Sequence, residues 1–154
     1  MQDINQLMKQ KLLDEMHVSI RNRIDASSKI LDEIQQSIDA ESQSTAGDKH
    51  DTSRELMQQE RNKAAQNLQN QVNLDVLLLK LKNIKDSDKI TFGSLVSTSI
   101  GLLFIGLPLG KIKFNGAEVL CVSGNSPIAQ NLVGARVGSI VPVNGQQIEV
   151  FDLT

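Results

Sequence analysis

The chain has no tryptophan and no tyrosine, and its 154 residues include four phenylalanines, three prolines and one cysteine. Without Trp and Tyr it lacks the usual aromatic platforms for stacking single-stranded bases, and the aromatic pocket of a prolyl isomerase is disfavoured. The lone cysteine, Cys121, cannot form an intramolecular disulfide, which favours a reducing, cytoplasmic setting. Because Cys121 stands in an apolar run, we expect it to be a small core residue.

An excess of positive charge is also absent, since 16 basic and 18 acidic residues give a net charge of −2. Such a chain carries no bulk basic signal for neutralising phosphates, so any contact with nucleic acid is expected to be indirect. The N-terminus lacks a positively charged region followed by an apolar run, and no secretory signal is expected. These totals favour a soluble cytoplasmic protein.

One uncharged stretch, residues 90–110, is long enough for a hydropathy window to indicate a transmembrane helix. Its internal pattern favours strands, because four glycines and Pro108 interrupt it and β-branched or aromatic residues lie between them. We therefore expect two strands joined by a turn, and no membrane contact. A spanning helix stays the alternative, because glycine is tolerated in such helices.

No proline or glycine occurs in the first 46 residues, and apolar side chains recur there at alternating three- and four-residue steps. This spacing predicts a coiled-coil helix over residues 1 to about 44, with one polar seam position at Ser27. A helix of that length reaches roughly 60 Å and needs a partner of similar length. The expected seam consists of Leu13, Met16, Ile20, Ile24, Ser27, Leu31, Ile34 and Ile38.

A second helical pattern follows Thr52, and the two segments predict an antiparallel αα-hairpin over residues 1–84 with its tip at 44–52. The amides between Gln66 and Asn73 are expected on the solvent side, with a polar layer that fixes register as the alternative. The end of the helix is apolar all round and is expected to dock on the tail of the same chain. The expected inner face consists of Met57, Ala64, Leu68, Val72, Val76 and Leu79.

A composition shift follows a polar linker at 83–89, and nine of the ten glycines lie beyond residue 90. Between two expected strands, Ser126 to Gly134 predicts a short helix with a Ser N-cap, a Pro at the first position and a Gly at its end. The Asn144-Gly145 pair predicts a tight hairpin. Strands are expected at 90–97, 102–107, 117–123, 138–143 and 146–153.

The predicted fold class is therefore α+β, with a long antiparallel helical coiled-coil hairpin followed by a small antiparallel β-sheet domain over residues 90–154 with one short helix. The four phenylalanines of that domain are expected in its core. They are Phe92, Phe104, Phe114 and Phe151.

The turn between the helices holds two carboxylates three residues apart, Asp48 and Asp51. Such a pair suits a hard cation, because Mg²⁺ prefers one or two carboxylates completed by waters and substrate oxygens. A purely structural alternative is that these acids, with Thr52 and Glu55 as a capping box, stabilise the start of the second helix by about 0.3–1 kcal/mol. His50 is expected to be solvated rather than a third ligand.

Basic residues are scattered along both helices, a distribution typical of a solvated surface, with a patch facing RNA or an acidic wall as the alternative. They are Lys9, Lys11, Arg21, Arg23 and Lys29 on the first helix and Arg61 and Lys63 on the second.

The tail resembles the FKBP-like C-terminal domain of the Gre-type transcript cleavage factors of bacterial RNA polymerase. Matching residues run from Gly93 to Val96, from Ser126 to Gly138 and from Gln147 to Val150, and the middle segment is the most specific. The order of parts is similar too. The tip, Gly47-Asp48 followed by Asp51, looks like the family's tip loop, which has an Asp and a Glu at the same spacing.

This resemblance implies a monomeric factor that is not itself an enzyme and has no cofactor of its own. Family members insert the hairpin into the secondary channel of RNA polymerase, and the sheet domain docks at the rim of that channel. The tip carboxylates, here Asp48 and Asp51, help to hold the second Mg²⁺ of the polymerase, which cuts backtracked RNA by two-metal chemistry.

The tip also departs from the family pattern. Asp51 is one methylene shorter than the Glu it replaces, and Arg54 and Glu55 stand where the family tends to have an acid and an aromatic residue. A secondary-channel modulator that does not stimulate cleavage, and a coiled-coil interaction protein, therefore stay open as alternatives.

Overall fold

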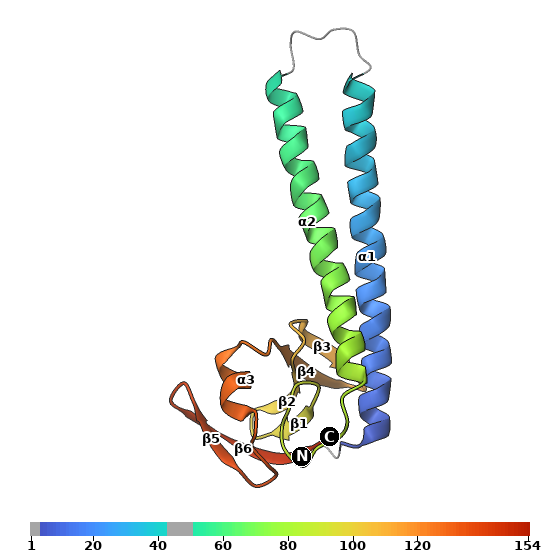
Figure 1. Ribbon diagram of the computed structural model, residues 1–154. Coiled ribbons are helices and arrows are strands. Elements are labelled where there is room, and N and C mark those ends of the chain that lie inside the picture. The colour runs from blue at the N-terminus through green and yellow to red at the C-terminus, as the bar shows by residue number, and fades with distance from the viewer. Residues whose placement is uncertain (1–3, 43–50) are drawn as a thin grey trace. The chain divides into compact units, whose positions relative to one another are not determined.

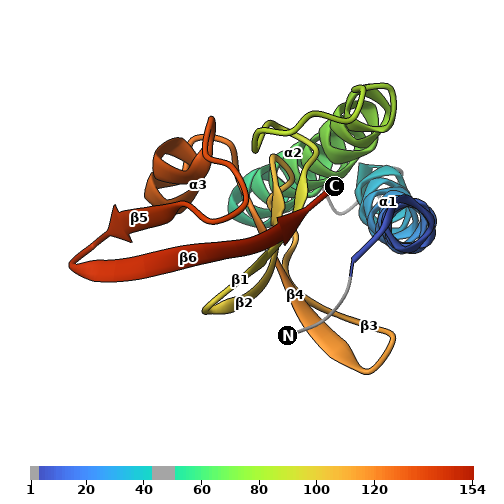
Figure 2. The ribbon, with the colours of Figure 1, turned by 90° about the horizontal axis from the view of Figure 1, so that it is seen from below.

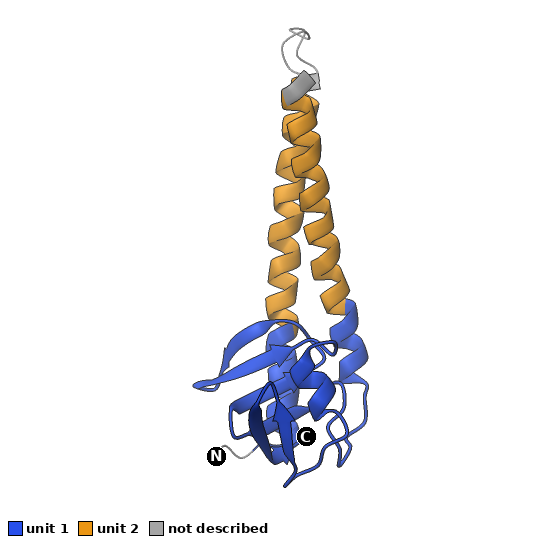
Figure 3. Ribbon diagram, turned by 90° about the vertical axis from the view of Figure 1, so that its left-hand side faces the viewer, with its two compact units in different colours: residues 1–16, 76–154 blue, residues 17–75 orange. Residues whose placement is uncertain are grey.

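The computed structural model describes residues 4–42 and 51–154, and side chains for 4–41 and 53–154 (Figure 1). The chain divides into two compact units (Figure 3). We call His17–Asp75 the hairpin unit, and Met1–Met16 with Val76–Thr154 the sheet unit. The expected α+β fold class is confirmed: two long helices are followed by a small sheet with one short helix.

The two long helices are α1, Gln6–Ser42, and α2, Asp51–Lys82. Both were expected from the apolar spacing and the absence of Pro and Gly. Within the hairpin unit α1 buries Ile20, Ser27 and Ile38, as the predicted seam requires. The remaining seam positions of that unit, Ile24, Leu31 and Ile34, are partly buried.

α2 follows its predicted inner face only in part. Val72 is partly buried, but Val76 and Leu79 are 47% and 48% exposed. Asp75 and Leu78, each one position earlier in the heptad, are the less exposed residues at this level. The prediction was wrong at Val76 and Leu79, because a helix that is apolar all round gives no preferred face in the sequence.

The sheet has six strands in the order β3-β4-β2-β1-β6-β5, and β6 lies between β1 and β5 (Figure 2). It is mixed rather than wholly antiparallel, because β2 and β4 pair in parallel. The strands are β1 Leu95–Thr98, β2 Gly101–Ile105, β3 Gly110–Phe114, β4 Ala117–Val122, β5 Ile140–Val143 and β6 Gln146–Leu153.

One strand, β3, was not predicted, although the turn that follows it carries the expected signal. Asn115 and Gly116 have φ of 50° and 75°, nearly the values of 49° and 78° at the predicted Asn144-Gly145 turn. Both are two-residue hairpin turns with positive φ at each position, the geometry that Asn-Gly favours. β3 itself was missed although it alternates charged and apolar residues as a half-buried strand does; it is short and contains only Ile112 and Phe114 as strand formers.

The short helix α3, Pro127–Leu132, forms as predicted. Ser126 is its N-cap and accepts a hydrogen bond from the backbone N–H of Ala129 at 3.3 Å. After the helix Gly134 adopts φ of 90°, and its N–H donates to the carbonyl of Ile90 at 2.8 Å. This contact joins the end of α3 to the segment that leads into β1.

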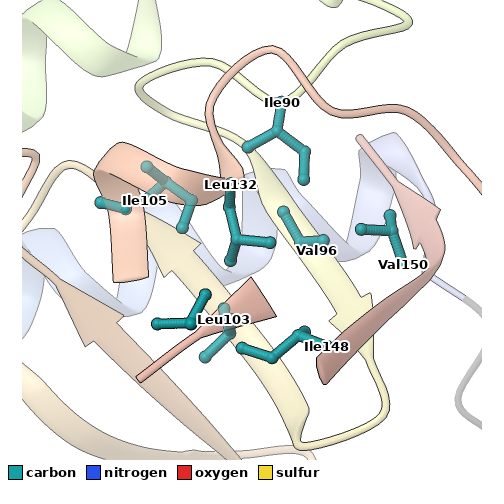
Figure 4. Close-up of a cluster of buried hydrophobic side chains, with 9 residues drawn as sticks. Ile90, Val96, Leu103, Ile105, Leu132, Ile148 and Val150 are labelled. Atoms are coloured by element: carbon teal, nitrogen blue, oxygen red, sulfur yellow. The ribbon is translucent and has the colours of Figure 1, made fainter. Parts of the chain in front are cut away.

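The core of the sheet unit lies between one face of the sheet and α3 (Figure 4). Successive side chains of a strand point to opposite faces, and on β1, β2 and β4 the opposite face is buried as well. Cys121 on β4 is 2% exposed, as expected. Phe92 was wrongly assigned to the core, because it is 49% exposed. The core residues are Ile90, Val96, Leu103, Ile105, Ala129, Leu132, Val143, Ile148 and Val150.

The uncharged stretch at residues 90–110 contains β1 and β2, which pair antiparallel as expected. A search of the helices in the described ranges for an apolar segment long enough to cross a membrane finds none.

Candidate functional site

The predicted tip carboxylates fall at the edge of what the structure describes. Asp48 and His50 lie outside the described residues, and Asp51 is the first residue of α2 although its side chain is not described. The predicted capping box of Thr52 and Glu55 stays a prediction, because the residues before Asp51 and the side chain of Thr52 lie outside the described part of the chain.

The two helices that lead to this turn are held together by polar contacts. Nδ1 of His17 lies 3.1 Å from Oδ1 of Asp75, and Nη1 of Arg21 lies 3.7 Å from Oδ2 of the same carboxylate. Asn67 donates from Nδ2 to Oγ of the buried Ser27 at 3.1 Å. Each contact joins α1 to α2 inside the hairpin unit.

A further contact of this kind joins Arg61 to Gln35, with Nε donating to Oε1 at 2.6 Å. Gln71 lies between Asn67 and Asp75, and its Oε1 is buried without a hydrogen-bond partner among the described atoms. Four polar contacts thus join α2 to α1 within the hairpin unit. We call these contacts the polar rungs; they are His17–Asp75, Arg21–Asp75, Ser27–Asn67 and Gln35–Arg61.

The cluster of amides on α2 divides between the two expected roles. Gln66 donates to Asn70 and Gln69 donates to Asn73, both within α2 and both on the exposed side. Asn67 instead reaches α1 through Ser27. The solvent-side prediction is confirmed for Gln66, Gln69, Asn70 and Asn73. The polar-layer alternative holds for Asn67.

Three of the scattered basic residues have partners within the chain. Lys9 lies 3.5 Å from Asp86, in the sheet unit, while Arg21 and Arg61 belong to the polar rungs. Lys11, Arg23, Lys29 and Lys63 are exposed. These positions agree with the predicted solvated surface rather than with one concentrated patch.

The sheet unit carries an apolar groove of about 410 Å³ that the sequence did not reveal. Its lining includes Leu77 and Leu81 of α2 and Ile84 just after it, together with Phe92, which precedes β1, and Pro108, which lies between β2 and β3. A Cβ built at Gly124 would lie 2.9 Å from Cε1 of Phe92, so the absent side chain makes room for the ring. Phe92, which is 49% exposed, is the aromatic residue of this lining.

Among the described residues no three His, Cys, Asp or Glu side chains are close enough to form a metal site. Burial raises the pKa of the Cys121 thiol from 9.0 to about 12, so this residue is a poor nucleophile at neutral pH. The role of Asp48 and Asp51 stays a prediction.

Comparison with known proteins finds no matching family model and no matching curated protein. The chain is similar to the crystal structure of the GreA factor homolog 1 (Gfh1) protein of Thermus thermophilus, with 17% identity and a TM-score of 0.32. That match covers 94% of this chain and 93% of the other. It is also similar to a structure of the transcription factor Gfh1, with 17% identity, a TM-score of 0.33, and coverage of 93% and 91%. These values describe a distant likeness.

Proposed function

We propose that the chain is a Gre-like transcription elongation factor that binds RNA polymerase through its secondary channel and stimulates the cleavage of backtracked RNA. It is not an enzyme by itself and supplies ligands to the polymerase. The observation that carries the proposal is the Ser126–Gly138 segment, where the residue-level resemblance is most specific. In the structure this segment forms a capped helix between β4 and β5, as the resemblance implies, and this agreement supports the proposal.

The helical hairpin fits the same proposal, because Asp48 lies between α1 and α2 in the sequence and Asp51 is the first residue of α2. Their donor chemistry fits Mg²⁺, which takes one or two carboxylates and fills its other positions with water and substrate oxygens. When bound, the ion supplies activation of water and charge stabilisation of the leaving oxygen. The chain's own part is to present the two carboxylates to the polymerase.

The test is RNA cleavage in backtracked elongation complexes with purified RNA polymerase and Mg²⁺. The chain is expected to shorten the RNA, and Asp48→Asn or Asp51→Asn is expected to abolish shortening while binding to the polymerase persists. Glu55→Gln is the matched control, because Glu55 is an exposed carboxylate one turn further along α2. It is expected to cleave like the unaltered chain.

Two results would redirect the proposal. Undiminished cleavage by both asparagine variants would remove the tip from the mechanism. Binding through the channel without any cleavage would favour the modulator alternative, and Asp51, one methylene shorter than the family's Glu, would be its physical reason. No binding to the polymerase would contradict the whole proposal.

A further inference from the structure

The polar rungs occupy the part of the hairpin where apolar packing is thinnest. From residue 53 to 75, every side chain of α2 is at least partly exposed, and the seam includes the small residues Ala64 and Ala65. On α1, one of the three buried residues in the unit is the polar Ser27. Ile20 and Ile38 are the buried apolar residues among the described side chains of this unit, so apolar burial contributes less here than in the sheet unit.

The rungs, by contrast, define one register. As α1 advances from His17 to Ser27 and Gln35, its partners on α2 retreat from Asp75 to Asn67 and Arg61. The Asp75 side chain is 15% exposed, so its contact with His17 is partly desolvated and depends on the partner being at the right level. Polar residues in a coiled-coil seam specify register in this way at some expense of stability.

Charge order penalises a slipped pairing in both directions. Along α2, Asp75 and Lys82 are one heptad apart, and along α1, Asp14 and Arg21 are one heptad apart. A slip of α2 by seven residues therefore brings either Lys82 to the level of Arg21 or Asp75 to the level of Asp14. Each slipped pairing opposes like charges, which destabilises a helix pair.

We propose that the polar rungs set the register of α1 against α2, and that Asp75, which takes part in two of the four, contributes most. Asp75 is a positioning residue, since the register decides at what level the two helices end next to the turn. This role holds whether or not the chain acts on RNA polymerase.

The experiment measures one distance between the helices of the full chain by pulsed electron spin resonance. Spin labels are placed at Gln36→Cys on α1 and Gln59→Cys on α2, which are exposed positions, in a Cys121→Ala background. The unaltered rungs are expected to give one narrow distance distribution. Asp75→Lys, which faces Arg21 with a like charge, is expected to give a second distance population that corresponds to a slip of α2 by seven residues, about 10 Å along its axis.

Two further variants make the test specific to register. Adding Arg21→Glu to Asp75→Lys restores an opposite-charge pair with its ends exchanged, and is expected to return the single narrow distribution. Glu60→Lys is the matched control, because it makes the same charge change at an exposed position of α2. It is expected to leave the distance unchanged.

An unchanged distance in Asp75→Lys, or a second population that Arg21→Glu does not remove, would overturn the proposal. The register would then follow from the ends of the helices in the sheet unit. If Asp75→Lys fails to fold, Asn67→Ala and Asp75→Asn provide the same comparison, and a single unshifted distance in both would again contradict it.

Discussion

Cys121 shows what burial does to one ionisable side chain. The residue lies on β4 and is 2% exposed, and loss of hydration raises the pKa of its thiol to about 12. The neutral thiol is therefore the form that the folded chain stabilises. In the unfolded chain the same group ionises near its ordinary value of 9.0.

The expected consequence is a loss of folding stability in alkaline solution. Above pH 9 the unfolded chain has released the Cys121 proton and the folded chain has kept it, so the free energy of unfolding falls as the pH rises toward about 12. Below pH 9 this contribution is fully present. Urea unfolding from pH 8 to 11 should show a steeper decline for the unaltered chain than for Cys121→Val.

The contradicting result for Cys121 is an identical pH dependence in the two proteins. Thiol labelling gives an independent measure, because native Cys121 should react slowly at pH 8 and the denatured chain should react at the rate of a free cysteine.

Gly124 shows how an absent side chain shapes a surface. Its φ is not positive, so the backbone does not require a glycine there. Its role is to leave space for the ring of Phe92. The sequence contains both residues, but nothing in their spacing indicates that they meet. The groove they border could therefore not be predicted, whereas the buried state of Cys121 could.

At the scale of elements, α3 is fixed by signals within nine residues of the chain. Ser126 caps it, Pro127 begins it and Gly134 follows it with a positive φ. Ser126 also donates from its hydroxyl to the carbonyl of Ser123 at 2.7 Å. This side chain thus connects the end of β4 to the start of the helix.

Replacing Ser126 by alanine is expected to lower the free energy of unfolding by about 1 kcal/mol, the usual effect of losing an N-cap. Urea denaturation followed by circular dichroism measures the change. Gln130→Ala is the control, because Gln130 is an exposed residue of the same helix, and alanine there should change stability by less than about 0.5 kcal/mol. Equal effects of the two substitutions would show that the cap does not matter.

Other elements depended on partners far away in the sequence. The periodicity of α1 and α2 and the caps of α3 are local, so the three helices were predicted, although α1 begins at Gln6 and not at residue 1. The parallel pairing of β2 with β4 is decided by packing of the whole sheet, and the sequence does not encode it locally. The inward position of Asp75 depends on His17 and Arg21 of another helix.

The candidate site was accessible to sequence reasoning only as a pair of acids. Asp48 and Asp51 were found from residue types and spacing, and the described structure neither supports nor opposes their role. Of the polar rungs, Ser27 was expected as a polar seam position, and Asn67 belonged to the amides for which a polar layer was the alternative. Their other members resemble ordinary surface residues until the opposite helix is in place.

At the scale of the whole molecule, charge predicts how the chain treats nucleic acid. The net charge is −2, and several of its basic residues are paired with side chains of the same chain. Neutralising phosphates requires unpaired cations. The chain has few to offer in any one place.

We therefore expect no saturable binding of a single-stranded RNA oligonucleotide up to about 100 µM protein, weaker than ordinary non-specific binding. Fluorescence anisotropy of a labelled oligonucleotide measures this, at both low and high salt. Asp32→Lys with Glu33→Lys is a control that adds positive charge, and it should bind better at low salt. Tight, salt-dependent binding by the unaltered chain would show that direct RNA contact is part of its action.

The two outer strands of the sheet have a consequence for handling the protein. β3 carries the exposed Lys111 and Lys113, and β5 contains Pro142, which has no N–H to donate. Cations and proline on border strands discourage another polypeptide from extending the sheet. Concentrated solutions of the protein are therefore expected to form neither aggregates nor fibrils. Lys111→Val or Lys113→Val is expected to promote aggregation.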